Sequence, residues 1–285
     1  IYTTMPVSSS HSYALTIELG NAIYVGVVVY ARDEPGGPVR AVSTLVDTDM
    51  ASTEGTFEIE VGASVAPDDA RGLHLDDRSF WIMVREYFVD PHDQQASAIV
   101  IERTDGEIID GLPDPADLAA GIDAASDWIR SQARADAALY ELVAFPEESR
   151  IQADPNVKVP DDLVSLFYPT PDIAYRGCRF TLDADEQLEV TFTPPACRFW
   201  SVVVSTPWFE SLEQRSTPAS INSATFETSE DGAVTVVVSE LDPGVANWIP
   251  LRGYRRGQVA YRVLLGEKAS PDATYIIGPV NSRHR

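Results

Sequence analysis

Carboxylates and aromatic rings gather in the sequence between Trp208 and Trp248, and this is where chemistry is expected. Glu210 lies beside Trp208, and Asp242 opens the segment Asp-Pro-Gly-Val-Ala-Asn-Trp that ends at Trp248. Two carboxylates can divide acid and base work when their surroundings separate their pKa values. Glu210 and Asp242 are therefore the candidate catalytic pair, for hydrolysis or elimination on a glycoside-like substrate.

Side chains that could hold such a substrate lie in the same region. Indole rings stack on the apolar face of a sugar, and Asn, Asp and Glu side chains beside them bond its hydroxyls. The candidate substrate-binding residues are Trp208, Asn222, Asn247, Trp248 and Arg262. A competing interpretation is structural, because Asp-Pro-Gly forms a good β-turn and an asparagine can bond the backbone of a turn. On that interpretation the chain is a non-catalytic ligand-binding or protein-assembly module.

Motifs for cofactors and metals are missing from the chain. There is no Gly-x-Ser-x-Gly elbow, no glycine-rich phosphate loop and no Cys-x-x-Cys. The histidines have neither helical nor hairpin spacing for metal ligands; they are His11, His74, His92 and His284. We therefore expect no cofactor and no metal.

Charge limits the partners of this protein. Acidic residues number 44 against 21 basic ones, a net charge of −23, which repels nucleic acid and anionic lipid headgroups. No stretch reaches the roughly 20 apolar residues of a membrane-spanning helix. The expected partner is a small molecule or a glycan, with no nucleic acid and no membrane, and the oligomeric state, a homo-oligomer included, stays open.

The cellular compartment is expected to be the cytoplasm. Export stays open, because the chain begins at Ile1 inside what resembles a strand. Cys178 and Cys197 stand in near-identical Cys-Arg-Phe contexts. A disulfide between them is one alternative, and two thiols, the commoner state in a cytoplasmic protein, are the other.

The sequence repeats one pattern of strands in its two halves. Three segments of the first half align in order with three of the second, separated by one small change in loop length. They are 13–30 with 188–205, 55–62 with 232–239, and 82–85 with 259–262. The repeat predicts two related β-rich units.

The fold class expected is mainly β: two repeat-related antiparallel jelly-roll-like β-sandwich units with a helical insert. Residues 1–110 would form the first unit, 111–172 the helical insert and connector, and 173–285 the second unit. Asp114 can cap a helix, or two short ones, ending at Pro146. A further helical turn is expected over 161–167 and a strand over 223–228. A single sandwich built from both halves is the alternative architecture.

The second half resembles a known family of bacterial proteins. Cys-Arg-Phe-Trp-Ser-Val-Val-Val over 197–204 is followed by Trp-Phe-Glu-Ser-Leu from Trp208, Ser-Ile-Asn ending at Asn222, and the Asp242 to Trp248 segment. In this order the segments resemble domain of unknown function 1214, most strongly over residues 175–265. The resemblance implies a jelly-roll β architecture and a bacterial source, but no established reaction.

Overall fold

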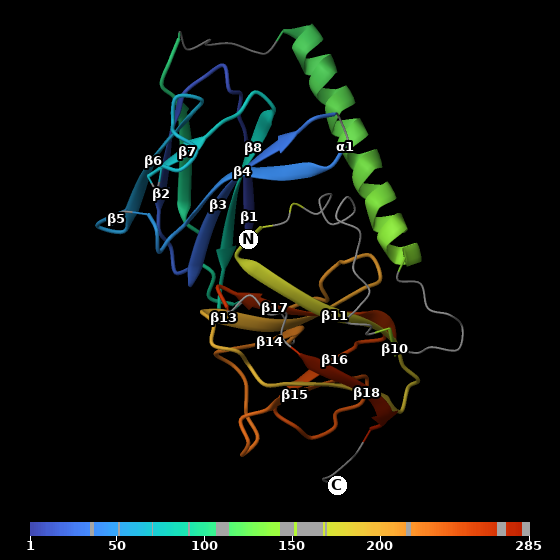
Figure 1. Ribbon diagram of the computed structural model, residues 1–285. Helices are drawn as coiled ribbons and strands as arrows, with labels where there is room; N and C mark the ends of the chain where they lie inside the picture. The colour runs from blue at the N-terminus through green and yellow to red at the C-terminus, as the bar shows by residue number, and fades with distance from the viewer. Residues whose placement is uncertain are drawn as a thin grey trace. The chain divides into compact units, whose positions relative to one another are not determined.

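The architecture is taken from a computed structural model of the chain (Figure 1). The residues described are 1–34, 37–50, 52–69, 71–90, 92–106, 114–142, 151–152, 168, 170–214, 218–266 and 272–280. The helical turn expected over 161–167 and the helix end expected at Pro146 lie outside these residues.

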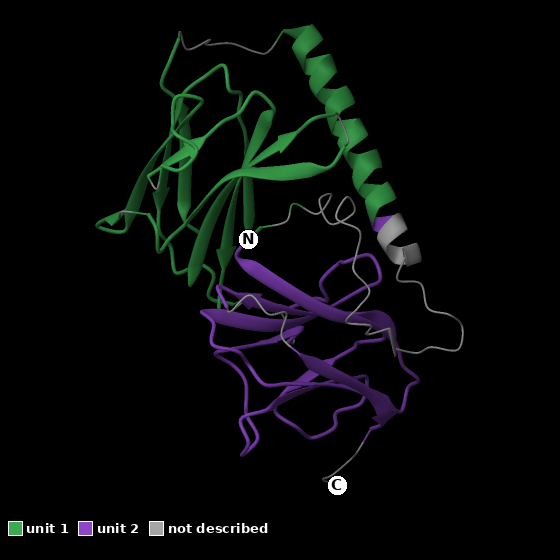
Figure 2. Cartoon of the chain, in the orientation of Figure 1, with its two compact units in different colours: residues 1–135, 159–170 green, residues 136–158, 171–285 purple. Residues whose placement is uncertain are grey.

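The chain divides into two compact units, coloured green and purple in Figure 2. Unit 1 comprises residues 1–135 and 159–170, and unit 2 comprises residues 136–158 and 171–285. A segment that follows the helix in sequence, and includes Tyr168, thus belongs to the first unit.

The described residues of unit 1 form two sheets and most of one helix. Its strands are β1 (Tyr2–Pro6), β2 (Tyr13–Glu18), β3 (Tyr24–Arg32), β4 (Val39–Val46), β5 (Ser52–Thr53), β6 (Thr56–Gly62), β7 (Gly72–His74), β8 (Ser79–Tyr87) and β9 (Ala98–Arg103). One sheet has the order β1-β8-β3-β4, and the other has the order β5-β6-β2-β9 with β7 beside β6.

Unit 2 also contains two sheets. Its strands are β10 (Ile151–Gln152), β11 (Ile173–Thr181), β12 (Glu186–Phe192), β13 (Phe199–Ser205), β14 (Ser220–Asn222), β15 (Val234–Ser239), β16 (Trp248–Pro250), β17 (Arg256–Leu264) and β18 (Ala273–Pro279). The sheet orders are β10-β11-β17-β13-β14 and β16-β15-β12-β18. The protein is therefore mainly β, as the sequence predicts.

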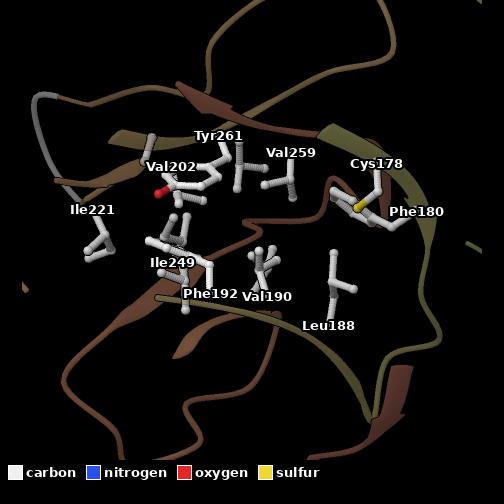
Figure 3. Packing of buried hydrophobic residues seen from close by; sticks show 14 of the residues in the cluster. Cys178, Phe180, Leu188, Val190, Phe192, Val202, Ile221, Ile249, Val259 and Tyr261 are labelled. Carbon is white, nitrogen blue, oxygen red and sulfur yellow. The ribbon is translucent and has the colours of Figure 1, made fainter. Parts of the chain in front are cut away.

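Alternating side chains place a buried hydrophobic cluster between the two sheets of each unit. In unit 1, Leu15 and Ile17 of β2 point toward Val27 of β3 and Val84 of β8, and all four are fully buried. In unit 2 the same role falls to Leu188 and Val190 of β12, Val202 of β13 and Val259 of β17, as Figure 3 shows. Because successive strand residues point to opposite faces, the intervening residues lie on the outer faces of the sheets.

Helix α1 (Pro115–Leu142) is a single long helix, one of the two alternatives predicted. Asp114 caps it, because its Oδ1 accepts the amide of Ala116 at 2.7 Å and its carbonyl accepts that of Leu118 at 2.9 Å. Proline at the first helical position costs no hydrogen bond, since that amide has no partner in a helix.

Two details of the predicted secondary structure are wrong. Pairing is not antiparallel throughout, since β6 with β7 and β15 with β16 run parallel. In each case the connecting loop returns the chain along the sheet edge before the next short strand begins. Residues 223–228 form no strand, because Asn222 holds a turn: its Oδ1 accepts the amide of Ala224 at 2.9 Å and its carbonyl accepts that of Thr225 at 3.0 Å.

The two cysteines are free thiols, the second of the alternatives left open by the sequence. Cys178 lies in the core of unit 2, where burial raises the pKa of its thiol far above the usual range. The pKa of Cys197 is also raised by burial. Neither thiol is therefore a ready nucleophile in this fold.

In the described part of the chain, no helix is both long and apolar enough to cross a membrane.

Candidate functional site

The outer face of the four-stranded sheet in unit 2 carries a polar row that is covered by protein. On β12, Gln187 and Glu189 flank the core residue Leu188, and on β15, Val237 precedes the core residue Val238. Because neighbouring residues of a strand point to opposite faces, these three side chains point away from the core. Outward-facing residues are normally exposed. Gln187 is only 4% exposed and Val237 only 5% exposed.

The cover is the loop 240–247 that joins β15 to β16. Asp242 shapes the turn, since its Oδ1 accepts the amide of Gly244 at 2.7 Å, and Gly244 has a positive φ of 73° that suits glycine. Val237 then donates its amide to the carbonyl of Asn247 at 2.8 Å, which fixes the end of the loop against β15.

Asn247 is the main brace of this loop. Its Oδ1 accepts the amide of Glu227 at 2.8 Å, and its Nδ2 donates to the carbonyls of Glu227 at 2.7 Å and Thr235 at 3.2 Å. The side chain is buried and its amide bonds are all made to backbone. Asn247 therefore ties a loop, a strand and the Glu227 segment together.

A pocket of about 350 Å³ remains between this loop and the sheet. Its lining residues are Gln187, Glu189, Glu227, Thr235, Val237, Pro243, Val245, Ala246 and Asn247. No lysine, arginine or histidine lines it. Gln187 donates its Nε2 to Glu189 Oε1 at 2.6 Å, which orients that carboxylate.

The pocket offers both hydrogen-bond acceptors and apolar surface. The carboxylates of Glu189 and Glu227 can accept hydrogen bonds from hydroxyl or ammonium groups. Val237, Pro243 and Val245 supply apolar surface. A volume of about 300 to 1,000 Å³ is typical of small-molecule sites, so this pocket fits a molecule at the small end of that range.

The predicted catalytic residues lie on exposed turns outside the pocket lining. Glu210 closes a turn in which Thr206 donates its amide to the Glu210 carbonyl at 2.8 Å and its hydroxyl to Glu210 Oε2 at 3.3 Å. Asp242 is exposed and bonded within its own turn, next to the lining residue Pro243.

The predicted binding residues are spread over unit 2, and Asn247 alone among them lines the pocket. Trp208 is 58% exposed on the turn before Glu210. Trp248 is half-buried, and its Nε1 donates to Ser239 Oγ at 3.0 Å. Asn222 is buried in its turn, and Arg262 lies on the five-stranded sheet with its guanidinium 5.8 Å from the ring centre of Tyr175.

Most residues that line the pocket are not among those predicted from the sequence. Strand alternation was the available signal for Gln187, Glu189, Thr235 and Val237, since it places all four outward. Nothing local indicates that a later loop would cover them. Across the described residues, no three His, Cys, Asp or Glu side chains are grouped so as to hold a metal ion.

The second unit also has relatives by sequence. Residues 168–268 match the family described as "Protein of unknown function (DUF1214)". The resemblance recognised from the Cys197 to Trp248 motifs is thereby confirmed over this segment. The DUF1214 segment contains β11 to β17, and with them every residue of the pocket lining.

Solved structures share the fold over almost the whole chain. A crystal structure of an uncharacterized protein from Burkholderia cenocepacia superposes with a TM-score of 0.83 at 23% identity, covering 98% of this chain and 76% of that one. The VPA0106 protein from Vibrio parahaemolyticus gives a TM-score of 0.59 at 12% identity, covering 97% and 88%. At these identities the likeness concerns the fold. No curated protein matches the sequence.

Proposed function

We propose that unit 2 binds a small carbohydrate-like or otherwise polyhydroxylated molecule in the pocket under the 240–247 loop. The observation that carries this proposal is a braced loop that covers an outward sheet face and yet leaves about 350 Å³ open beneath it. Loops held over a rigid sheet are where binding sites commonly lie.

The lining chemistry supports a neutral or cationic ligand. Glu189 and Glu227 face the pocket without a basic residue among the lining, so an anionic ligand would be repelled. Carboxylates bond pairs of neighbouring hydroxyls, while Val237, Pro243 and Val245 can contact the apolar face of a ring. A sugar or another polyol presents both kinds of surface.

A catalytic function, as a hydrolase or lyase, is the second candidate, and the presence of two carboxylates in the pocket lining favours it. Glu189 and Glu227 are an alternative to the predicted pair Glu210 and Asp242. If a glycoside is cleaved or eliminated, single carboxamide variants of the four residues decide between the pairs. Variants of the catalytic pair would lose about 100-fold or more in kcat, and variants of the other pair would retain the wild-type kcat.

A thermal-shift screen of neutral glycosides, oligosaccharides and polyols tests the binding proposal, because a ligand of the native state raises the melting temperature. Ala246→Trp fills the pocket, and Leu241→Trp places the same ring on the same loop outside the lining. We expect a shift in the wild type and in Leu241→Trp, and none in Ala246→Trp. An equal shift in all three proteins, or no shift with any compound, would contradict the proposal.

We also propose that the two units arose by duplication of one jelly-roll-like sandwich. Strand order supports this, because β1-β8-β3-β4 corresponds to β11-β17-β13-β14, and β7-β6-β2-β9 corresponds to β16-β15-β12-β18. The pairing register agrees as well. Val27 pairs with Val84 in unit 1, and at the aligned positions Val202 pairs with Tyr261 in unit 2.

We also propose that the protein is cytoplasmic and that its partner is a small molecule or a glycan. Free thiols at Cys178 and Cys197 support a cytoplasmic location, where cysteines stay reduced. The net charge of −23 supports a small-molecule or glycan partner rather than nucleic acid.

A further inference from the structure

Aromatic rings and arginines gather on the outer face of the β1-β8-β3-β4 sheet in unit 1, a region that the pocket in unit 2 does not involve. Trp81 of β8 stacks on Tyr168, with ring centres 5.7 Å apart and planes inclined by 21°. Trp128 of α1 meets Trp81 edge to face at 6.0 Å. We call Arg32, Phe80, Trp81, Trp128 and Tyr168 the aromatic–arginine cluster.

Two irregularities of the sheet meet at this cluster. The register of β3 shifts between Val29 and Tyr30 against β4, and between Tyr30 and Ala31 against β8. In β8 the partner of Tyr30 is Trp81 and the partner of Ala31 is Ser79, so Phe80 is an extra residue. A bulge of this kind changes the direction of a side chain. Here it brings the Phe80 ring beside Trp81, with centres 5.4 Å apart.

Arg32 holds a positive charge against this cluster. Its guanidinium carbon lies 4.7 Å from the centre of the Phe80 ring, and its Nη2 donates to the Tyr168 hydroxyl at 3.3 Å. The Nε of Arg32 is buried and has no hydrogen-bond partner among the described residues. Nor does a carboxylate oxygen of those residues lie within 4.0 Å of Arg32. A buried N–H group of an arginine without a partner is costly, so the Nε of Arg32 is a donor that a bound acceptor would satisfy.

The Tyr168 hydroxyl adds a second donor. Its oxygen accepts from Arg32 Nη2 and from Trp128 Nε1 at 3.0 Å, and neither of these groups can accept a proton in return. The phenol proton of Tyr168 is therefore available for an acceptor that the described side chains do not supply. Nε and Nη2 lie on one edge of the guanidinium, the edge that binds carboxylates with two parallel bonds.

The ring positions also provide access. Trp128 is 37% exposed, so the cluster reaches the surface of unit 1. On the same strand as Trp81, Arg85 donates its Nη2 to the Tyr30 hydroxyl at 2.7 Å and to the carbonyl of Tyr168. Arg85 thus fixes the position of Tyr168, and it adds positive charge beside the cluster.

We propose that the aromatic–arginine cluster is a binding site for a small organic acid, a carboxylate carried on an aromatic or apolar body. The carboxylate accepts from the Nε and Nη2 edge of Arg32 and from the Tyr168 hydroxyl, and the body packs against Trp81 and Trp128. This ligand differs in charge from the one proposed for unit 2.

Benzoate is the probe, and benzamide is its uncharged counterpart of the same shape. Titration calorimetry on the full chain should detect benzoate binding at constant ionic strength, and benzamide should bind at least about tenfold more weakly. Inorganic phosphate, which lacks the ring, should bind more weakly than benzoate. Equal binding of benzamide would overturn the role of charge, and equal binding of phosphate would overturn the role of the rings.

Variants locate the site. Arg32→Gln should weaken benzoate binding about tenfold or more, and Tyr168→Phe, which keeps the ring but loses the proton, about threefold to tenfold. Arg71→Gln removes the same charge from an exposed position outside the cluster and should bind benzoate like the wild type. Arg32→Lys keeps the charge but lacks the guanidinium edge that makes two parallel hydrogen bonds, so it should bind benzoate with intermediate affinity. This variant tests the proposal even if Arg32→Gln fails to fold. Wild-type affinity in Arg32→Gln, or no benzoate binding to the wild type, would overturn the proposal.

Discussion

The two units share a framework of strands and differ in what covers the outer faces of their sheets. Aligned core positions are filled alike, as with Leu15 and Val190, Val27 and Val202, or Ile59 and Val236, all fully or almost fully buried. Unit 2 covers the outer face of its β12-β15 pair with the 240–247 loop and leaves a pocket beneath it. Unit 1 instead places rings and arginines on the outer face of its other sheet. The framework therefore stabilises each unit, and the two binding sites that we propose lie in the parts that are not shared.

One polar feature is common to both units. Arg85 of β8 pairs across the strands with Tyr2 of β1, and Arg262 of β17 pairs in the same way with Tyr175 of β11. The guanidinium carbons lie 5.7 and 5.8 Å from the tyrosine ring centres. The two arginines differ in burial, since Arg85 is 4% exposed and Arg262 is half-buried. Equivalent positions can thus be tested for unequal energetic roles.

The largest effect is expected when Arg85 is removed. Arg85→Ala deletes charge-assisted hydrogen bonds to the Tyr30 hydroxyl and the Tyr168 carbonyl, and should lower the free energy of unfolding by about 3 kcal/mol. Arg262→Ala should cost about 1 kcal/mol, because the mainly cation–π contact with Tyr175 is partly exposed. Urea unfolding of both variants measures this difference. Equal losses would show that the two arginines have the same role.

The brace of the unit 2 loop comes next. Asn247→Ala removes three hydrogen bonds to the backbone of Glu227 and Thr235 and leaves buried groups unpaired, so about 2 kcal/mol should be lost. Asp242→Ala removes one bond within an exposed turn and should cost about 1 kcal/mol or less. Thermal unfolding distinguishes the two. If Asn247→Ala is no more costly than Asp242→Ala, the loop is not held by Asn247.

Two fully buried tyrosines should respond in opposite directions to loss of the hydroxyl. Tyr30→Phe breaks the bond to the Tyr168 carbonyl at 3.0 Å and removes an acceptor for Arg85, so unit 1 should lose about 1 to 2 kcal/mol. The hydroxyl of Tyr261 in unit 2 has no hydrogen-bond partner among the described residues. Tyr261→Phe should therefore stabilise unit 2 by about 1 kcal/mol. Chemical unfolding of both variants measures the difference. If both changes destabilise the protein, the Tyr261 hydroxyl is not an unpaired buried group.

The smallest effect is a dependence on pH from the turn before β8. Burial tends to raise the pKa of Asp76, but hydrogen bonds from Arg40, Ser79 and the Arg78 amide outweigh it, and the pKa is lowered. A lowered pKa means that the ionised form stabilises the fold above about pH 4 and that this contribution is lost as the pH falls through the folded-state pKa. In unit 2 the equivalent turn is braced by Glu240, which accepts the amide of Gly253 at 2.7 Å.

In Asp76→Asn the decrease in the free energy of unfolding from neutral to acidic pH should be smaller than in the wild type. The difference should be less than about 1 kcal/mol, since the Arg40 contact is partly exposed. Asp77→Asn makes the same charge change at a position 87% exposed and should leave the acid profile as it is. Melting temperatures measured from pH 2 to pH 7 compare the two variants. If the two variants have the same dependence of melting temperature on pH, Asp76 does not contribute to the loss of stability in acid.

The sequence could predict the shared framework because local patterns determine it. The Val-Val-Val runs that begin at Val27 and Val202 and the alternation of β12 mark the core strands, and Asp114 with Pro115 marks the start of α1. The three-residue strands β7 and β16 were missed, since their parallel pairing is fixed by neighbouring strands and not by their own residues.

The pocket was harder to predict than the fold. Glu189 and Glu227 are distant in sequence, and they line the same pocket because Asn247 ties the Glu227 segment to the loop over β12 and β15. The sequence instead indicates Glu210 and Asp242, because each lies in a segment that carries a tryptophan, Trp208 or Trp248. Neighbours in sequence are not neighbours in a sandwich, where each outward residue alternates with a core residue.

Hydrogen–deuterium exchange of the full chain tests most directly whether the unshared loop of unit 2 binds ligand. It is measured with and without the glycoside or polyol that gives the largest thermal shift. Bound ligand should slow exchange of the amides in the 240–247 loop and the adjoining Glu227 segment. The loop over 63–69, which occupies the corresponding place in unit 1, should exchange at an unchanged rate. Equal slowing in both loops, or slowing that leaves the 240–247 loop unaffected, would contradict the account.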